Sequence, residues 1–223
     1  MKLSRRTVLA TGAAALAMPS IARAQEAMRH FALVRGRSHI GTHHLSVSRA
    51  RDIVNVEITV DISVRVMGFT AYRYEMSSHE LWQGGILHSL HAHTNHDGEN
   101  AYVTAARSGD QIDIEGSAFN GSVGLDVGTT TYWTPALMQR STWISTQGGM
   151  PLNIRPVSTG LVRYEMAHSH VGATGYALGD ELPATAYYTD EGEWVGNTFD
   201  ARGAEVKYIP DDISQPFAPL WTG

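Results

Sequence analysis

The sequence predicts an all-β fold with little helix, in which a strongly curved antiparallel sheet forms an open or incomplete β-barrel. Three observations predict it. Apolar and polar residues alternate strictly along one long segment, turns rich in glycine and asparagine follow at short intervals, and a helix signal is visible only after Pro135. Period-two alternation is typical of strands, and several short strands separated by turns are typical of barrels and sandwiches.

The clearest strand is expected at residues 53–66, IVNVEITVDISVRV. Apolar, mostly β-branched residues share one parity from Val54 to Val66, and polar residues share the other. A helix would distribute these residues around its circumference, so the segment is expected to be a strand with one dry and one wet face. It is long for a strand, so we expect it to bend, to twist or to contribute to two sheets.

Further strands are expected on both sides of a loop and a short helix. After a turn at Gly68, the turn residues and the alternation predict a meander with strands at residues 69–82, 86–94, 101–107 and 111–115. Residues 117–131 are rich in glycine and are expected to be a loop, followed by the helix after Pro135. Strands are expected again in the segments 148–157, 160–171, 184–200 and 202–209, which makes roughly ten strands in all.

The chain divides into a leader, one domain and a tail. Residues 1–24 have a basic start, a short apolar stretch and an Ala22-x-Ala24 cleavage motif before Gln25. Residues 25–209 are expected to form a single β-rich domain, since no linker of domain scale interrupts them. Residues 210–223 contain three prolines and are expected to be an irregular tail.

The leader resembles a twin-arginine export signal. The motif is SRRTVL, with Arg5 and Arg6 as the arginine pair, and an ordinary secretory signal is the alternative. The twin-arginine hypothesis predicts a periplasmic protein that the twin-arginine export machinery carries in a folded state. The apolar stretch of the leader is too short to span a bilayer.

Charge and cysteine content exclude several classes of partner and site. The leader holds four of the 17 basic residues and none of the 22 acidic ones, so the remaining 199 residues have a formal net charge of −9. Such a surface repels phosphate backbones, so no nucleic-acid partner is expected. The absence of cysteine excludes disulfides, thiolate metal sites and a lipidated cysteine, and we expect a soluble protein without a lipid anchor.

Histidines raise the hypothesis of a metal site. Strand parity predicts that His91 and His93, an H-x-H pair, face water, whereas His88, His168 and His170 face inward. The two H-x-H pairs then lie on opposite faces, so they cannot share one metal unless a bulge intervenes. The inward set, His88, His168 and His170, is the candidate metal site, and buried histidines bonded to tyrosines are the alternative. No resident cofactor is otherwise expected.

The sequence favours a binding protein over an enzyme. It has no G-x-S-x-G motif and no cysteine nucleophile, so no catalytic residue is assigned. Large side chains on inward parity are the expected lining of an apolar cavity: Tyr72, Tyr74, Trp82, Tyr164 and Met166. Three functions follow as hypotheses: a carrier of an apolar or lipid-like small molecule, a module that binds an envelope protein through a sheet edge, and a histidine-based metal-dependent enzyme.

Several segments resemble an uncharacterised family of exported proteobacterial β-proteins. They are VRGRSHIGTHHLSVSR, VEITVDISVRV, YRYEMSSHELWQGGILHSLHAHTNHDG, TYWTPALM and YYTDEGEWV, which together span most of the chain after the leader. The architecture is similar to the open barrels of LolA/LolB-like lipoprotein carriers, in which a curved sheet wraps an apolar cavity. This resemblance implies a fold and transfers no site residue.

Overall fold

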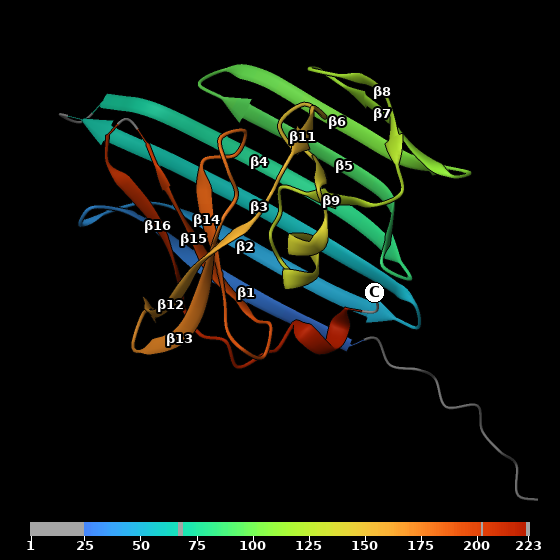
Figure 1. The fold of residues 1–223 in the computed structure, drawn as a ribbon. Helices are drawn as coiled ribbons and strands as arrows, with labels where there is room; N and C mark the ends of the chain where they lie inside the picture. Colours follow the sequence, from blue (N-terminus) through green and yellow to red (C-terminus); the bar gives the residue numbers. More distant parts are fainter. Residues whose placement is uncertain (1–24, 67–68, 202, 222–223) are drawn as a thin grey trace, which may run out of the picture.

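The computed structural model describes residues 25–66, 69–201 and 203–221, and its main element is a large curved antiparallel sheet (Figure 1). The sheet has 13 strands, which lie side by side in the order β12-β13-β14-β15-β16-β1-β2-β3-β4-β5-β6-β7-β8. The strands β12 and β8 are its edges, so the barrel is open. The predicted fold class is therefore confirmed.

The first half of the chain forms a meander of long hairpins. Its strands are β1 (Gln25–Arg35), β2 (Ser38–Ala50), β3 (Ile53–Val66), β4 (Phe69–Gln83), β5 (Ile86–His96), β6 (Glu99–Ser108), β7 (Gln111–Gly116) and β8 (Asn120–Gly124). The alternation predicted for β3 is confirmed, because the apolar side chains from Val54 to Ile62 are buried and those of Glu57, Thr59 and Asp61 are exposed. The leader, residues 1–24, and the turn expected at Gly68 lie outside the described residues.

The second half of the chain adds a small sheet and then returns to the large one. Its elements are β9 (Val127–Thr129), the 3-10 helix η1 (Pro135–Gln139), β10 (Thr142–Ile144), β11 (Pro151–Asn153), β12 (Val157–Glu165), β13 (His170–Ala177), β14 (Ala184–Tyr188), β15 (Trp194–Asp200), β16 (Glu205–Pro210) and the 3-10 helix η2 (Ala218–Leu220). β16 pairs with β1, with Phe31 opposite Pro210 and Arg35 opposite Val206. This pairing places the first described strand in the middle of the sheet.

The core lies between the large sheet and the segment from β9 to β11, which crosses in front of the long strands in Figure 1. Four tryptophans are fully buried in it: Trp82, Trp133, Trp143 and Trp194. Burial of such large apolar surfaces stabilises a domain that has no disulfide.

The segment predicted to be a loop contains two strands, which is a correction. β8 and β9 both fall within residues 117–131, and the helix expected after Pro135 is a 3-10 helix of five residues, capped by the hydroxyl of Thr134. Gly128 shows why the pattern was invisible. A Cβ there would lie 2.9 Å from the indole nitrogen of Trp143, so the close packing of the backbone against this ring requires glycine. Because glycine has no side chain, it adds nothing to the alternation of apolar and polar residues by which a strand is recognised.

The tail closes the end of the core opposite to the cavity described below. Phe217 and Leu220 are buried, and the Trp221 ring centroid lies 5.5 Å from that of Trp82 and 5.3 Å from that of Trp133. None of the helices in the described part of the chain is long and apolar enough to cross a membrane.

Candidate binding site

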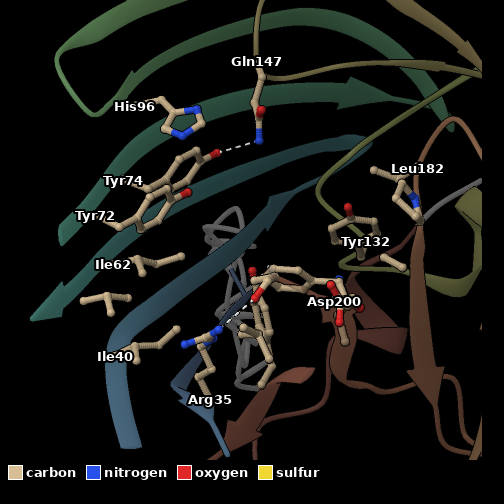
Figure 2. Close-up of a pocket in the computed structure, with 18 of the residues that line it drawn as sticks. Arg35, Ile40, Ile62, Tyr72, Tyr74, His96, Tyr132, Gln147, Leu182 and Asp200 are labelled. Carbon is tan, nitrogen blue, oxygen red and sulfur yellow. Dashed lines mark hydrogen bonds between the residues drawn. The ribbon is translucent and has the colours of Figure 1, made fainter. Parts of the chain in front are cut away.

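A cavity of about 570 Å³ opens at the end of the sheet where several hairpins turn (Figure 2). Arg35 and Ile40 flank the β1–β2 turn, Val64 and Ala71 flank the β3–β4 turn, and Asp200 ends β15. The complete lining is Arg35, Ile40, Ile62, Val64, Ala71, Tyr72, Tyr74, His96, Tyr132, Gln147, Leu182, Pro183, Ala184, Asn197, Phe199, Asp200, Ala201, Val206 and Tyr208.

The walls near the mouth are mainly apolar. Ile40, Ile62 and Val206 occupy inward positions of β2, β3 and β16, and Phe199 and Leu182 lie across from the long strands. The same alternation that buries the dry face of the sheet therefore supplies the walls of the cavity. Mostly apolar walls with a few polar groups are typical of small-molecule sites.

Tyr72 and Tyr74 line the cavity from β4 (Figure 2). The phenol oxygen of Tyr74 accepts a hydrogen bond of 2.9 Å from the Nε2 amide of Gln147, a residue that lies between β10 and β11. Burial raises the pKa of Tyr74 to about 12, so this phenol is neutral at physiological pH. The Tyr72 ring packs edge-on against His96, with centroids 5.3 Å apart.

Tyr132 enters the cavity from the opposite side, between β9 and η1 (Figure 2). Its φ of 61° is in the left-handed region, which is unusual for a bulky residue. The phenol of Tyr188 donates a 2.7 Å hydrogen bond to the carbonyl of Tyr132 and so holds this backbone conformation. Burial raises the pKa of the Tyr132 phenol.

Tyr208 lies deeper along β16 than Val206. Its ring packs against Phe31 and His43, with centroids 5.9 and 5.3 Å away, and burial raises the pKa of its phenol. The buried amide of Asn197 joins the lining from β15, where its Oδ1 accepts a hydrogen bond from the indole nitrogen of Trp194.

Charged groups of the lining lie at the mouth. Arg35 is the last residue of β1 and donates a 3.2 Å hydrogen bond to the carbonyl of Ala201 in the β15–β16 turn. Asp200 is exposed at the end of β15, and His96 is exposed at the end of β5. The deep end, formed by Tyr132, Tyr208 and Asn197, contains no lysine, arginine, aspartate or glutamate of the described lining.

Trp82, Tyr164 and Met166 do not line the cavity, although parity predicted that they would. Trp82 belongs to the core near the tail. Tyr164 packs with its ring centroid 4.7 Å from that of Tyr187, in a small second cluster, whereas the next residue, Tyr188, faces the main core. In the curved sheet, the apolar side of the β12–β13 hairpin packs on Tyr187 of β14 and Val195 of β15. Met166 is buried at the end of that hairpin.

The three histidines predicted to face inward are exposed. His88 lies at a bulge, since Trp82 pairs with Leu87 and Leu81 with Ser89, which leaves His88 without a partner residue in the ladder. β12 ends at Glu165, so its alternation no longer places His168, and His170 begins the next strand, β13, opposite Glu165. No group of three or more histidine, aspartate or glutamate side chains within residues 25–66, 69–201 and 203–221 is arranged to hold a metal ion.

Other parity predictions for histidines and lining residues had mixed outcomes. His91 and His93 are exposed, as predicted. Tyr208, Asn197 and Gln147 were not predicted as lining residues. Tyr208 shares the parity of Val206 and was therefore detectable, whereas nothing local indicates that Gln147 reaches Tyr74.

The family of the chain follows from residues 31–211, which match the domain of unknown function DUF6134. The chain belongs to this family. Among solved structures, it is similar to the β-barrel-like protein of the domain of unknown function DUF1849 from Brucella abortus, with 11% identity and a TM-score of 0.55. The similarity covers 83% of this chain and 94% of the other, and at this identity it concerns the fold alone. The comparison with curated proteins found no match.

The expected resemblance to an uncharacterised β-barrel family is thus confirmed. Function therefore has to be inferred from the cavity itself.

Proposed function

We propose that this DUF6134 protein is a soluble periplasmic binding or carrier protein that holds an apolar or lipid-like small molecule in the cavity between β3, β4, β15 and β16. The single observation that carries the proposal is this cavity of about 570 Å³, with apolar walls and an exposed mouth. If each non-hydrogen atom takes about 30 Å³, the share of one water molecule, the cavity accommodates roughly 20 such atoms.

The shape of the site supports binding over catalysis. Ile40, Ile62 and Phe199 offer dispersion contacts, and the neutral phenols offer hydrogen bonds, but no serine, threonine or cysteine lies among the described lining residues. A ligand that buries apolar surface at about 25 cal/mol per Å² would gain binding free energy from these walls.

Uptake of the fluorescent apolar probe N-phenyl-naphthylamine tests the proposal. We expect the wild type to bind the probe, and we expect Ala184→Trp, which fills the cavity, to weaken binding at least tenfold. Ala71→Trp should weaken probe binding in the same way by obstructing the mouth, and because Ala71 is exposed, this substitution should disturb folding less. Ala106→Trp, at an exposed position of β6, is the matched control and should bind as the wild type does. Absence of probe uptake by the folded wild type would refute the proposal.

The periplasmic location is tested separately, through the leader. We expect the double substitution Arg5→Lys and Arg6→Lys to leave the protein in the cytoplasmic fraction of the bacterium that makes it, because the twin-arginine pair is the recognition element. Export of this variant at the wild-type level would indicate an ordinary secretory signal instead.

One observation favours a second function, the binding of an envelope protein. β12 is an edge strand, hydrogen-bonded to β13 on one side, and its side chains Val157, Leu161 and Val162 are exposed, Leu161 by 72%. An extended segment of a partner could add to such an edge as a further antiparallel strand. A photo-crosslinker at Leu161 should then capture a partner in periplasm, whereas one at Tyr102, on the exposed side of β6, should not.

A further inference from the structure

The side chains that line the cavity differ between its mouth and its deep end, and this difference indicates the kind of ligand that it binds. β3 and β4 run antiparallel, with Val64 opposite Tyr72 near their turn and Ile62 opposite Tyr74 further in. On β16, Val206 lies nearer the β15–β16 turn and Tyr208 lies deeper. Val64, Val206 and Phe199 therefore lie near the mouth, with Arg35 and Asp200 at its rim, whereas Tyr208 and Asn197 lie deeper.

Three hydrogen-bond donors at the deep end have no partner among the residues that the structure describes. The phenols of Tyr132 and Tyr208 donate to no other residue in the described part of the chain, and neither does the Nδ2 amide of Asn197. All three residues line the cavity. These donors face the cavity, so a ligand that displaces water from it is expected to accept from them.

The chemistry of these three donors indicates which ligand group can accept from them. The Oδ1 atom of Asn197 already accepts from the indole nitrogen of Trp194, whereas its Nδ2 amide is available to donate to a ligand. The phenols of Tyr132 and Tyr208 stay protonated at neutral pH, because burial raises the pKa of both. The deep end thus presents several donors and no counter-ion for a charged group.

A charged ligand end would be disfavoured at this depth. A carboxylate or an ammonium group would lose its hydration, and the lining groups Arg35 and Asp200 lie at the mouth. A carbonyl oxygen loses less hydration and can accept two hydrogen bonds.

We propose that the ligand enters with its polar end first and that this end is a neutral carbonyl group, whose oxygen accepts two hydrogen bonds from among the donors of Tyr132, Tyr208 and Asn197. The apolar body then lies toward the mouth, between Ile62 and Phe199. This inference rests on the proposed binding function and adds to it the chemical class of the ligand: an apolar chain or ring system that ends in a ketone, ester or quinone-type carbonyl.

Competition between two probes of equal chain length tests this inference. Bound N-phenyl-naphthylamine is displaced at neutral pH by methyl nonyl ketone or by undecanoate, which carry a neutral and an anionic end. We expect the ketone to displace the probe at a concentration at least tenfold lower. In the double variant Tyr132→Phe, Tyr208→Phe, the ketone should lose about tenfold in affinity, as expected for the loss of hydrogen bonds worth roughly 1.4 kcal/mol in total.

Controls separate this inference from the function on which it rests. Displacement is corrected for the affinity of the double variant for N-phenyl-naphthylamine, its urea unfolding midpoint shows that it folds, and Tyr102→Phe on the exposed side of β6 should change nothing. Absence of probe uptake by the wild type would refute the binding function. Probe uptake with equal displacement by undecanoate, or an unchanged ketone affinity in the double variant, would refute the carbonyl inference alone.

Discussion

The carboxylate of Glu80 accepts a 2.7 Å hydrogen bond from the indole nitrogen of Trp82, and both side chains are buried on one face of β4. The hydroxyl of Thr131 donates to the other carboxylate oxygen at 2.9 Å, so Glu80 joins the large sheet to the segment that follows β9. Because the site is fully buried, the pKa of Glu80 is raised above its ordinary value of 4.5.

The substitution Glu80→Gln should remove one source of pH dependence. A carboxyl group whose pKa is raised by folding binds more protons in the folded state than in the unfolded state. Its contribution to the free energy of unfolding is therefore present below pH 4.5 and is lost as the pH rises toward the folded-state pKa. We expect the free energy of unfolding of Glu80→Gln to exceed that of the wild type increasingly over this range, measured by urea unfolding at a series of pH values. Glu57→Gln, on the exposed face of β3, is the control, and an equal pH slope in wild type and Glu80→Gln would contradict the prediction.

His43 should destabilise the fold in acid. Its two ring nitrogens have no hydrogen-bond partner in the described part of the chain, and burial lowers its pKa from 6.5 to about 3. The unfolded chain then binds more protons, so stability is lost as the pH falls below 6.5, by about 2 kcal/mol at pH 5. We expect His43→Leu to abolish this loss in denaturant unfolding, while His91→Gln at an exposed site leaves it intact. An undiminished loss in His43→Leu would show that another group is responsible.

The buried ion pair between Arg29 and Glu193 should hold the tail. Their side chains lie 3.1 Å apart, and Glu193 also accepts from the backbone amides of Phe217 and Ala218 at 2.8 and 3.0 Å. Arg29→Leu leaves a buried carboxylate without its cation, so we expect a loss of about 3–5 kcal/mol in the free energy of unfolding.

The exposed pair of Arg73 and Glu75 is the matched comparison for that substitution. Arg73→Leu should cost no more than about 1 kcal/mol, because solvent screens an exposed pair. Similar losses in the two variants would contradict a special role for the buried pair.

Gly196 should tolerate no side chain. Its φ is 142°, and a Cβ there would lie 2.5 Å from the phenol oxygen of Tyr164 and 2.8 Å from the carbonyl of Tyr208. We expect Gly196→Ala to lower the free energy of unfolding by at least about 1–3 kcal/mol and to weaken probe binding, because Tyr208 must shift. Gly36→Ala, in a turn with φ of 62° and open space around it, should cost only about 1–2 kcal/mol and leave binding unchanged. Equal effects in both would indicate that the crowding around Gly196 is unimportant.

Much of the fold was predictable from local patterns. The alternation along β3 predicted its dry face from Val54 to Ile62, and parity also placed Tyr72 and Tyr74 correctly on the inner face. The prediction failed for His88 because a bulge shifts the parity of β5 by one residue. It failed for Tyr164 because the curl of the sheet creates a second small core behind β14.

The sequence by itself determined the strands, their dry faces and the absence of disulfides, because alternation and composition are properties of the local chain. Only the tertiary structure decided which inward residues face a hollow and which face other side chains. Tyr132 and Gln147 meet Tyr74 across the cavity although they lie more than fifty residues away in the chain, as the separation of 73 between Gln147 and Tyr74 shows. Such meetings depend on curvature, bulges and long-range packing, which no period in the sequence encodes.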